Sequence, residues 1–203
     1  MDDAWLRALA ESPWLLPALF LLVVGDAFLV VLPSETVVVA LAALAGATGS
    51  PPLAAIIPVA ALGALTGDLL CFTIGRRAGL DRWRWQRIPV IRRAIERVRV
   101  TVLTRPASLI FTARYIPFAR IAVNLSAGAS GLSYRRFLPL AAVAGASWAV
   151  YNCVVGLFFG TVLAATPIVA IIVSVVVAVS VGLATDAIIG RATRPSPPPA
   201  ADR

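Results

Sequence analysis

Long apolar runs that stop at prolines and charged residues set the pattern of the N-terminal part of the chain. The first run extends from Trp14 to Leu32 and stops at Pro33-Ser34-Glu35. A second run, Thr36 to Ala47, is shorter than the roughly 20 residues that a helix needs to cross a bilayer. Two short arms joined at a proline predict a re-entrant hairpin with Pro33 and Ser34 at its tip. Irregular backbone at membrane depth must be satisfied by protein or by a wet cavity, so the tip is expected to face a cavity.

The middle of the chain predicts one membrane span followed by a basic amphipathic helix. Residues 53–75 are apolar enough to span, although Asp68 lies within them. The segment 82–105 is rich in arginine, and its apolar positions recur at helical spacing opposite the arginines. This pattern predicts an amphipathic helix at the cytoplasmic membrane surface.

A second interrupted hairpin is predicted after the arginine-rich segment. A short apolar arm begins at Pro106 and reaches Arg114, and a second arm ends near Gly131. Pro117 lies between the arms and lacks the amide proton that a continuous helix would need, so it is expected to form the tip.

Two further apolar segments predict transmembrane helices. Residues 137–160 form one, and residues 167–189 form an additional C-terminal helix. The tail, 190–203, is Pro-rich and basic, which predicts disorder in the cytoplasm. The sequence therefore predicts an all-α integral membrane protein with a single membrane domain over residues 1–189.

The two halves of the chain resemble each other. A shift of 82 positions superposes residues 45–49 on 127–131, and it also superposes two further pairs, Gly63-Ala64 on Gly145-Ala146 and Cys71 on Cys153. If the arginine-rich segment is cytoplasmic, the halves have opposite orientations, which predicts an inverted repeat. Transporters with such repeats place broken helices at the membrane midplane, with helix N-termini directed at an anionic substrate.

Composition and charge indicate a lipid environment. The 60% apolar content, 14% charged content and mean hydropathy of +0.90 exclude a soluble domain of ordinary composition. The net charge of +8 comes from 18 basic residues, all arginine, and more than half of them lie in residues 76–105. A basic loop beside apolar spans follows the positive-inside rule, so it is expected to face anionic headgroups in the cytoplasm, and no nucleic-acid partner is expected.

Neither a metal site nor an enzyme active site is predicted. Cys71 and Cys153 lie within apolar runs, and the chain has no His. Without His, a cysteine in a polar setting or a recognisable nucleophile motif, catalysis is not expected, and no cofactor is implied.

Charged residues within the apolar stretches require a physical reason, because each costs roughly 2.5 to 3.5 kcal/mol at a helix centre on insertion scales. The cost falls if they converge and pair with one another or with a substrate. They are Asp26, Glu35, Asp68, Arg114 and Arg120. Pairing that only fixes helix packing is the alternative interpretation.

The two arginines are the candidate phosphate ligands. On an unbroken helix Arg114 and Arg120 would be separated by about 240 degrees, but Pro117 between them allows both to point into one cavity. A guanidinium suits phosphate because its fixed fork donates two parallel hydrogen bonds and stays charged.

The three carboxylates are the candidate proton-coupling groups. Burial favours the neutral form of a carboxyl group and a neighbouring arginine favours its charged form, so small movements can load or release a proton. Glu35 is the first candidate because it lies at the hairpin tip, with Asp26 and Asp68 as partners.

Three small-residue motifs are predicted to bring helices into close contact rather than to bind substrate. They are Gly63-x-x-x-Gly67, Gly75-x-x-x-Gly79 and Gly156-x-x-x-Gly160.

Motifs over residues 20–160 resemble the DedA family, whose conserved region is also called the VTT or SNARE-associated domain. The resemblance rests on Leu32-Pro33-Ser34-Glu35, on Gly67-Asp68 with Phe72, Gly75-Arg76 and Gly79, and on Phe111, Arg114, Pro117, Arg120, Asn124, Ala127-Gly128 and Phe137. It implies two re-entrant hairpins that meet in the membrane. Bacterial relatives are associated with recycling undecaprenyl phosphate or flipping phospholipids, often with dependence on proton motive force.

These observations together predict a multi-pass transporter of the bacterial inner membrane that translocates a polyprenyl phosphate or a phospholipid. Arg114 and Arg120 would bind the phosphate and Glu35 would exchange a proton. A proton-coupled cation or drug antiporter remains an alternative, as does a non-transporting scaffold that depends on Arg92, Arg93 and Arg97. Lipids and protons are the expected partners, and a homo-oligomer is left open.

Overall fold

Helices dominate the described part of the chain. The computed structural model describes residues 10–29, 34–79, 99–114, 117–162 and 176, and none of these lies in a strand. The elements are α2 Leu15–Asp26, α3 Ser34–Thr48, α4 Leu53–Ala78, α6 Pro106–Arg114, α7 Pro117–Ala129 and α8 Tyr134–Val162. The predicted all-α fold class is therefore confirmed for these residues.

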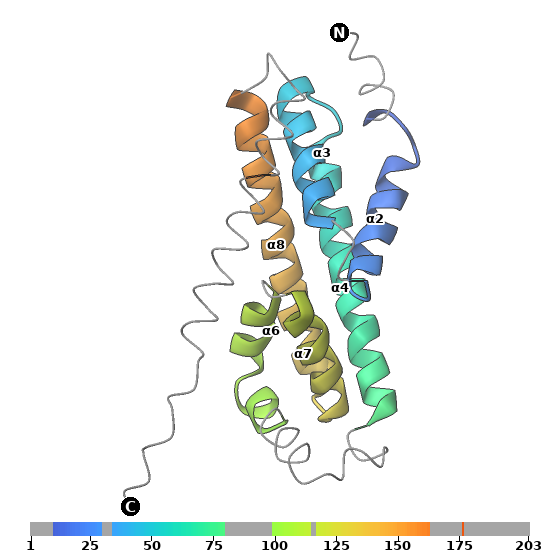
Figure 1. Cartoon of the computed structure of the whole chain (residues 1–203), viewed down its shortest axis with the longest axis vertical. Coiled ribbons are helices and arrows are strands. Elements are labelled where there is room, and N and C mark those ends of the chain that lie inside the picture. The colour runs from blue at the N-terminus through green and yellow to red at the C-terminus, as the bar shows by residue number, and fades with distance from the viewer. Residues whose placement is uncertain (1–9, 30–33, 80–98, 115–116, 163–175, 177–203) are drawn as a thin grey trace, which may run out of the picture.

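Two of these helices, α4 and α8, are long and apolar enough to span a membrane. The spanning stretches have 26 residues in α4 and 28 in α8. At about 1.5 Å per residue, both exceed the ~30 Å hydrocarbon core of a bilayer. In Figure 1, α4 runs from top to bottom and α8 from bottom to top, and the two pack against each other. They coincide with the spans predicted at residues 53–75 and 137–160, and are candidate membrane spans by length and composition.

The other four helices are too short to cross a bilayer singly. The longest, α3, has 15 residues, and would extend only about 22 Å. Within the apolar run predicted to reach Leu32, α2 ends at Asp26 and is followed by a turn at Ala27 and Phe28, and residues 30–32 lie outside the described part of the chain. Pro33, predicted to form the first tip, lies outside the described residues.

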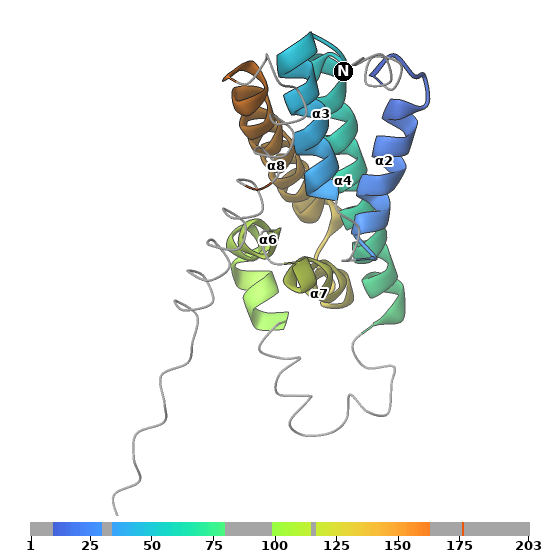
Figure 2. The same cartoon turned by 45° about the horizontal axis from the view of Figure 1, so that its top comes forward.

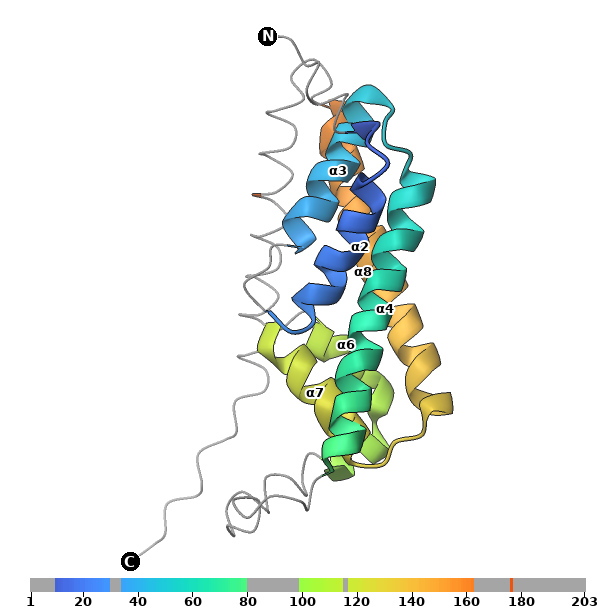
Figure 3. The ribbon, with the colours of Figure 1, turned by 90° about the vertical axis from the view of Figure 1, so that its right-hand side faces the viewer.

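The short helices form two pairs beside opposite halves of α4 and α8. The α2–α3 pair lies along one half and the α6–α7 pair along the other, and the ends of the pairs meet near the middle of the long helices (Figures 1 and 3). Each pair contacts both long helices, since α2 packs on α4 and α3 on α8, whereas α6 packs on α8 and α7 on α4. Figure 2 shows α3 against the long helices, with α2 on the outer side of α4.

Two apolar cores lie on either side of the place where the pairs meet. The first is formed mainly by α2, α3, α4 and α8, and includes Leu19, Val38, Ile56, Ala64 and Trp148. The second is formed mainly by α4, α6, α7 and α8, and includes Phe72, Ile110, Ala127 and Phe137. On α4, the boundary falls between Ala64 and Phe72, where Asp68 is placed. The cores therefore hold a charged residue between them.

Glycines allow the short helices to approach the long ones closely in both halves. A Cβ atom added at Gly75 or Gly128 would collide with backbone across the contact between α4 and α7. Gly156 and Gly160 lie on α8, and a Cβ added at either position would collide in the same way with the backbone of α3. The two halves therefore use the same means to pack the second helix of each pair.

The close-packing role predicted for the glycine motifs is confirmed except at one position. Gly63 and Gly67 face α2 at distances that leave little or no space for a side chain. Gly79 has no neighbour within 4 Å of an added Cβ, and its φ of +69° ends α4. It serves as a helix terminator, because glycine adopts this backbone conformation without steric cost.

The predicted internal repeat has a counterpart in the backbone. Gly49 follows α3 and Gly131 follows α7, and both have a φ of +81°. They are superposed by the shift of 82 positions, so a glycine with the same φ follows both helices, directly after α3 and one residue further on after α7.

Several predicted elements lie outside the described residues. They are most of the arginine-rich segment 82–105, the C-terminal helix 167–189 apart from Val176, and the tail 190–203. Residues 99–104, at the end of the arginine-rich segment, are helical.

Candidate functional site

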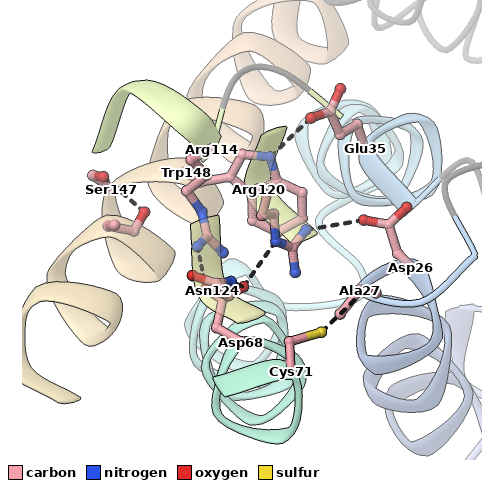
Figure 4. A network of polar contacts seen from close by, with 11 residues as sticks. Asp26, Ala27, Glu35, Asp68, Cys71, Arg114, Arg120, Asn124, Ser147 and Trp148 are labelled. Carbon is pink, nitrogen blue, oxygen red and sulfur yellow. Dashed lines mark hydrogen bonds and ion pairs between the residues drawn. The ribbon is translucent and has the colours of Figure 1, made fainter. Parts of the chain in front are cut away.

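A buried carboxylate on α4 lies where the two helix pairs meet. Asp68 exposes 1% of its surface and accepts three hydrogen bonds, as Figure 4 shows. Arg114 Nη1, from α6, lies 2.5 Å from Asp68 Oδ2. Arg120 Nε and Asn124 Nδ2, both from α7, each lie 2.8 Å from Oδ1. Both carboxylate oxygens are engaged, so Asp68 ties α4, α6 and α7 together at one point.

Arg120 connects Asp68 to a second carboxylate on α2. Its Nη1 atom lies 3.1 Å from Asp26 Oδ2, while its Nε atom donates to Asp68. The side chains of Arg120 and Asp26 expose 11% and 17% of their surface. One guanidinium thus joins the first helix pair to the second. Its Nη2 atom is buried and makes no hydrogen bond within the described segments.

Glu35 joins the same cluster through an aromatic side chain. Trp148, on α8, donates a hydrogen bond from Nε1 to Glu35 Oε1 at 3.1 Å. The Cζ atom of Arg114 lies 5.7 Å from the Trp148 ring centroid, which is within the range of a cation–π interaction. Glu35 is exposed in the first turn of α3, whereas Trp148 is 3% exposed. The network therefore extends from an exposed acid to a buried ion pair.

The break between α6 and α7 allows two arginines to reach one carboxylate. Helix α6 ends at Arg114 and α7 begins at Pro117, which confirms the predicted interruption. Proline is favoured at a first helical position because its missing N–H group would have no partner there. Arg114 lies in the last turn of α6, where the helix dipole stabilises a positive charge. The sequence thus places the positive charge of Arg114 at the C-terminal end of α6, where the helix dipole is favourable to it.

All five charged residues that were predicted to converge lie in this network. They are Asp26, Glu35, Asp68, Arg114 and Arg120. The arginines predicted to hold a phosphate are hydrogen-bonded to Asp68. Of the predicted tip residues, Ser34 is buried at the start of α3 and Pro117 is the first residue of α7. The transport roles of these residues stay predictions.

Two further polar side chains belong to the network. Asn124 entered the sequence analysis only through the family motif, although its spacing of four residues from Arg120 places both on one face of a helix. Trp148 was not predicted. Its indole N–H group, in the middle of an apolar span, needs a hydrogen-bond partner when buried, and this requirement is the sequence signal that points to it.

The arrangement can serve two kinds of chemistry. Guanidinium and amide groups can bind an anion, and the carboxylates can exchange protons. Within the described segments, no group of three or more His, Cys, Asp and Glu side chains is placed to hold a metal ion.

Comparison with known proteins assigns the chain to a family. A family model described as the VTT domain matches residues 32–158, which is more than half of the chain. The matched region runs from just before α3 through most of α8, so it includes Glu35, Asp68, Arg114 and Arg120, whereas Asp26 precedes it. Searches of curated proteins and of solved structures gave no match. The resemblance carried by the sequence motifs is thus confirmed, and the chain belongs to the DedA family of VTT-domain membrane proteins.

Proposed function

We propose that this protein moves an anionic lipid phosphate, either a polyprenyl phosphate or a phospholipid, across the bilayer in a process that depends on proton motive force. The observation that carries the proposal is the convergence of Arg114, Arg120 and Asn124 on the Asp68 carboxylate. Such a set of donors suits a phosphate, because guanidinium groups donate charge-assisted hydrogen bonds to its oxygens. Asp68 would occupy the position of the phosphate oxygens when no lipid is bound.

Competition for the same donors would link lipid binding to a proton. The buried arginines need an anionic partner, because an uncompensated buried charge is strongly unfavourable. Two anions sharing one site repel each other, so a phosphate displaces Asp68 most readily when the carboxyl group takes up a proton. Asp68 and the phosphate would then alternate as the partner of Arg114 and Arg120. The remaining buried N–H group of Arg120, at Nη2, is a further donor for the phosphate.

Graded exposure of the three acids supports Glu35 as the group that meets protons first. Glu35 is exposed, the Asp26 side chain exposes 17% of its surface and the Asp68 side chain 2%. In this proposal, water entering a cavity at the meeting point of the two helix pairs would reach them in that order. In this proposal Glu35 takes up the proton, and Asp26 and Asp68 respond through the contacts of Arg114 and Arg120.

We also propose that the α2–α3 and α6–α7 pairs are re-entrant hairpins of an inverted repeat. Their helices are too short to cross a bilayer, and α4 and α8 run in opposite directions. In each pair, the first helix packs on the long helix that follows the pair and the second helix packs on the other long helix. Arg76 and Arg77, at the end of α4, support a cytoplasmic position for that end by the positive-inside rule. This topology suits the inner membrane of a bacterium.

A lipid phosphate suits this site because only its headgroup needs to cross the protein. The long chain remains in the bilayer and keeps its apolar environment. The charged network lies at the meeting point of the two pairs, between the apolar cores. A headgroup held there would be half-way along α4 and α8.

The test is transbilayer movement of a fluorescently labelled polyprenyl phosphate in proteoliposomes, with and without an imposed pH gradient. Wild-type protein is compared with Arg114→Ala, Arg120→Ala and Glu35→Gln, and with Arg135→Ala, an exposed arginine at the start of α8, as a matched control. Loss of movement in the three site variants and its retention in the control are expected. Wild-type movement no faster than in empty liposomes would refute the proposal.

Proton-coupled antiport of a cation or drug is the second candidate, and one observation favours it. Within the described residues, the exposed Glu35 carboxylate has Trp148 as its hydrogen-bond partner and forms no ion pair with an arginine, so it could receive a cation. Lipid phosphate transport needs the planar guanidinium group of arginine, which donates two parallel hydrogen bonds, whereas antiport needs only a positive charge. Arg114→Lys and Arg120→Lys should abolish lipid movement, whereas an antiporter in which arginines only tune the acids should retain part of its activity.

A further inference from the structure

We infer that Trp148 is a positioning residue that transmits the protonation state of Glu35 to Arg114, an inference that rests on the proposed function. The indole N–H group of Trp148 donates to Glu35, and the face of its ring lies near the Arg114 guanidinium (Figure 4). Trp148 is therefore in contact with both the exposed acid and a buried arginine. It is itself 3% exposed and belongs to the first apolar core, which limits its freedom to move independently.

The contact between Trp148 and Glu35 is sensitive to charge. An indole N–H group can only donate, so Glu35 must be the acceptor in this hydrogen bond. A hydrogen bond to an ionised carboxylate is roughly twice as strong as one to a neutral acceptor. Protonation of Glu35 therefore weakens the bond that fixes the Trp148 ring on its Glu35 side.

The contact between Trp148 and Arg114 carries this change toward the buried pair. A cation near the face of a tryptophan ring is attracted by the ring quadrupole, and the attraction is stronger when water is excluded. Arg114 is 6% exposed and donates to Asp68. A less firmly held ring stabilises Arg114 less well, so the hold of Arg114 on Asp68 weakens when Glu35 takes up a proton.

The other two acids near Glu35 bind the arginines directly, whereas Glu35 is connected to them through its hydrogen bond with Trp148. Asp26 on α2 is paired with Arg120 on α7, and Asp68 on α4 is bonded to Arg120 and to Arg114 on α6. Asp26 is also close enough to Glu35 for their charges to interact. Glu35 therefore acts on Asp26 through space and on Arg114 through the Trp148 ring.

Fluorescence of Trp148 tests the connection without any transport. Replacing Trp5, Trp14, Trp83 and Trp85 by phenylalanine leaves Trp148 as the single tryptophan, whose emission can be excited selectively over that of tyrosine. Its emission is expected to change as pH is lowered, and Glu35→Gln is expected to abolish the change. Asp26→Asn, which removes the other nearby acid, should retain it. An emission that does not respond to pH, or that responds equally in Glu35→Gln, would overturn the inference.

Transport measurements on Trp148 variants form the second arm. Trp148→Phe keeps a ring and loses the N–H group, so stimulation of polyprenyl phosphate movement by a pH gradient should fall about tenfold, as in Glu35→Gln. Trp148→Leu loses the ring as well, so binding of the labelled lipid in the absence of a gradient should also weaken by about tenfold. Trp14→Phe, at a position 76% exposed at the start of α2, is the matched control and should match the wild type in both assays.

The two arms separate failure of the inference from failure of the proposed function. If wild-type protein shows the Glu35-dependent fluorescence change but moves no lipid, the proposed function is wrong while the link between Glu35 and Trp148 stands. If lipid moves and Trp148→Phe retains the full gradient stimulation, Trp148 is a packing residue only and the inference is wrong.

Discussion

Asp68 and Arg114 form a buried ion pair in which Asp68 Oδ2 and Arg114 Nη1 lie 2.5 Å apart and the side chains expose 2% and 3% of their surface. The pair joins α4, the first of the two long helices, to α6, the short helix that precedes α7. It lies between the two apolar cores, so solvent screens the charges weakly. Such a pair stabilises a fold only while both partners are present, since removal of one leaves a buried charge alone.

Asp68→Asn is therefore expected to destabilise the protein by about 3–5 kcal/mol. The amide removes the negative charge that compensates Arg114 and Arg120. Denaturant unfolding in detergent micelles would measure the free energy of unfolding. Arg135→Gln, at an exposed position of α8, should change it by about 0.5 kcal/mol or less. An Asp68→Asn variant as stable as this control would contradict the pairing.

Arg120→Lys is expected to lose the link between the two helix pairs while keeping a positive charge. Arg120 uses Nε for Asp68 and Nη1 for Asp26, and the single ammonium group of lysine cannot reproduce this divergent geometry. The expected loss of stability is about 1.5–3 kcal/mol, the contribution of one hydrogen bond between charged groups. A double-mutant cycle with Asp26→Asn measures it, because the second substitution should cost little once the link is broken. Strictly additive effects would contradict a direct contact.

The hydrophobic pattern was sufficient to predict α4 and α8, because each is a long apolar run with few interruptions. Pro117 correctly predicted the break between Arg114 and Arg120, since proline acts on its own neighbourhood in the chain. The end of α2 at Asp26 was not predicted. The apolar residues that follow continue the run to Leu32, but a turn interrupts the helix at Ala27 and Phe28, and hydropathy alone carries no information about such a turn.

The charged residues of the candidate site could be predicted from the cost of burying them, but their pairing could not. Asp68 and Arg120 are separated by 52 residues, so only the folded arrangement brings them into contact. Trp148 escaped prediction for the same reason, because tryptophan in an apolar span fits both an interface anchor and a core residue. The partner of its N–H group, Glu35, lies 113 residues away in the chain.

Gly128→Ala is expected to destabilise the contact between α4 and α7. A Cβ atom at this position would collide with the carbonyl oxygen of Phe72, and overpacking of this kind typically costs about 1–3 kcal/mol. Gly145→Ala is the matched control, because its Cβ would meet no atom closer than 3.4 Å. Thermal unfolding in detergent should show a lowered midpoint for Gly128→Ala and an unchanged or raised midpoint for Gly145→Ala. Equal midpoints in the two variants would argue against close contact at Gly128.

Cysteine labelling in intact vesicles is expected to show that the α2–α3 pair enters and leaves the membrane on one side. In a background in which Cys71 and Cys153 are replaced by alanine, Glu11→Cys and Thr48→Cys should react with a bulky, membrane-impermeant maleimide from the same side. Ser133→Cys, directly before the start of α8, should react only from the other side of the membrane. These results would exclude a single crossing by the pair.

Labelling near the tip distinguishes a re-entrant pair from one that crosses the membrane twice. Phe28 is 43% exposed and follows α2, whose 12 residues extend only about 18 Å. Because this length falls short of the hydrocarbon core, Phe28→Cys should react with the bulky reagent from neither side, yet react fully after solubilisation in detergent. Reaction of Phe28→Cys from the Ser133 side in intact vesicles would show that both helices cross, and the re-entrant topology would be wrong.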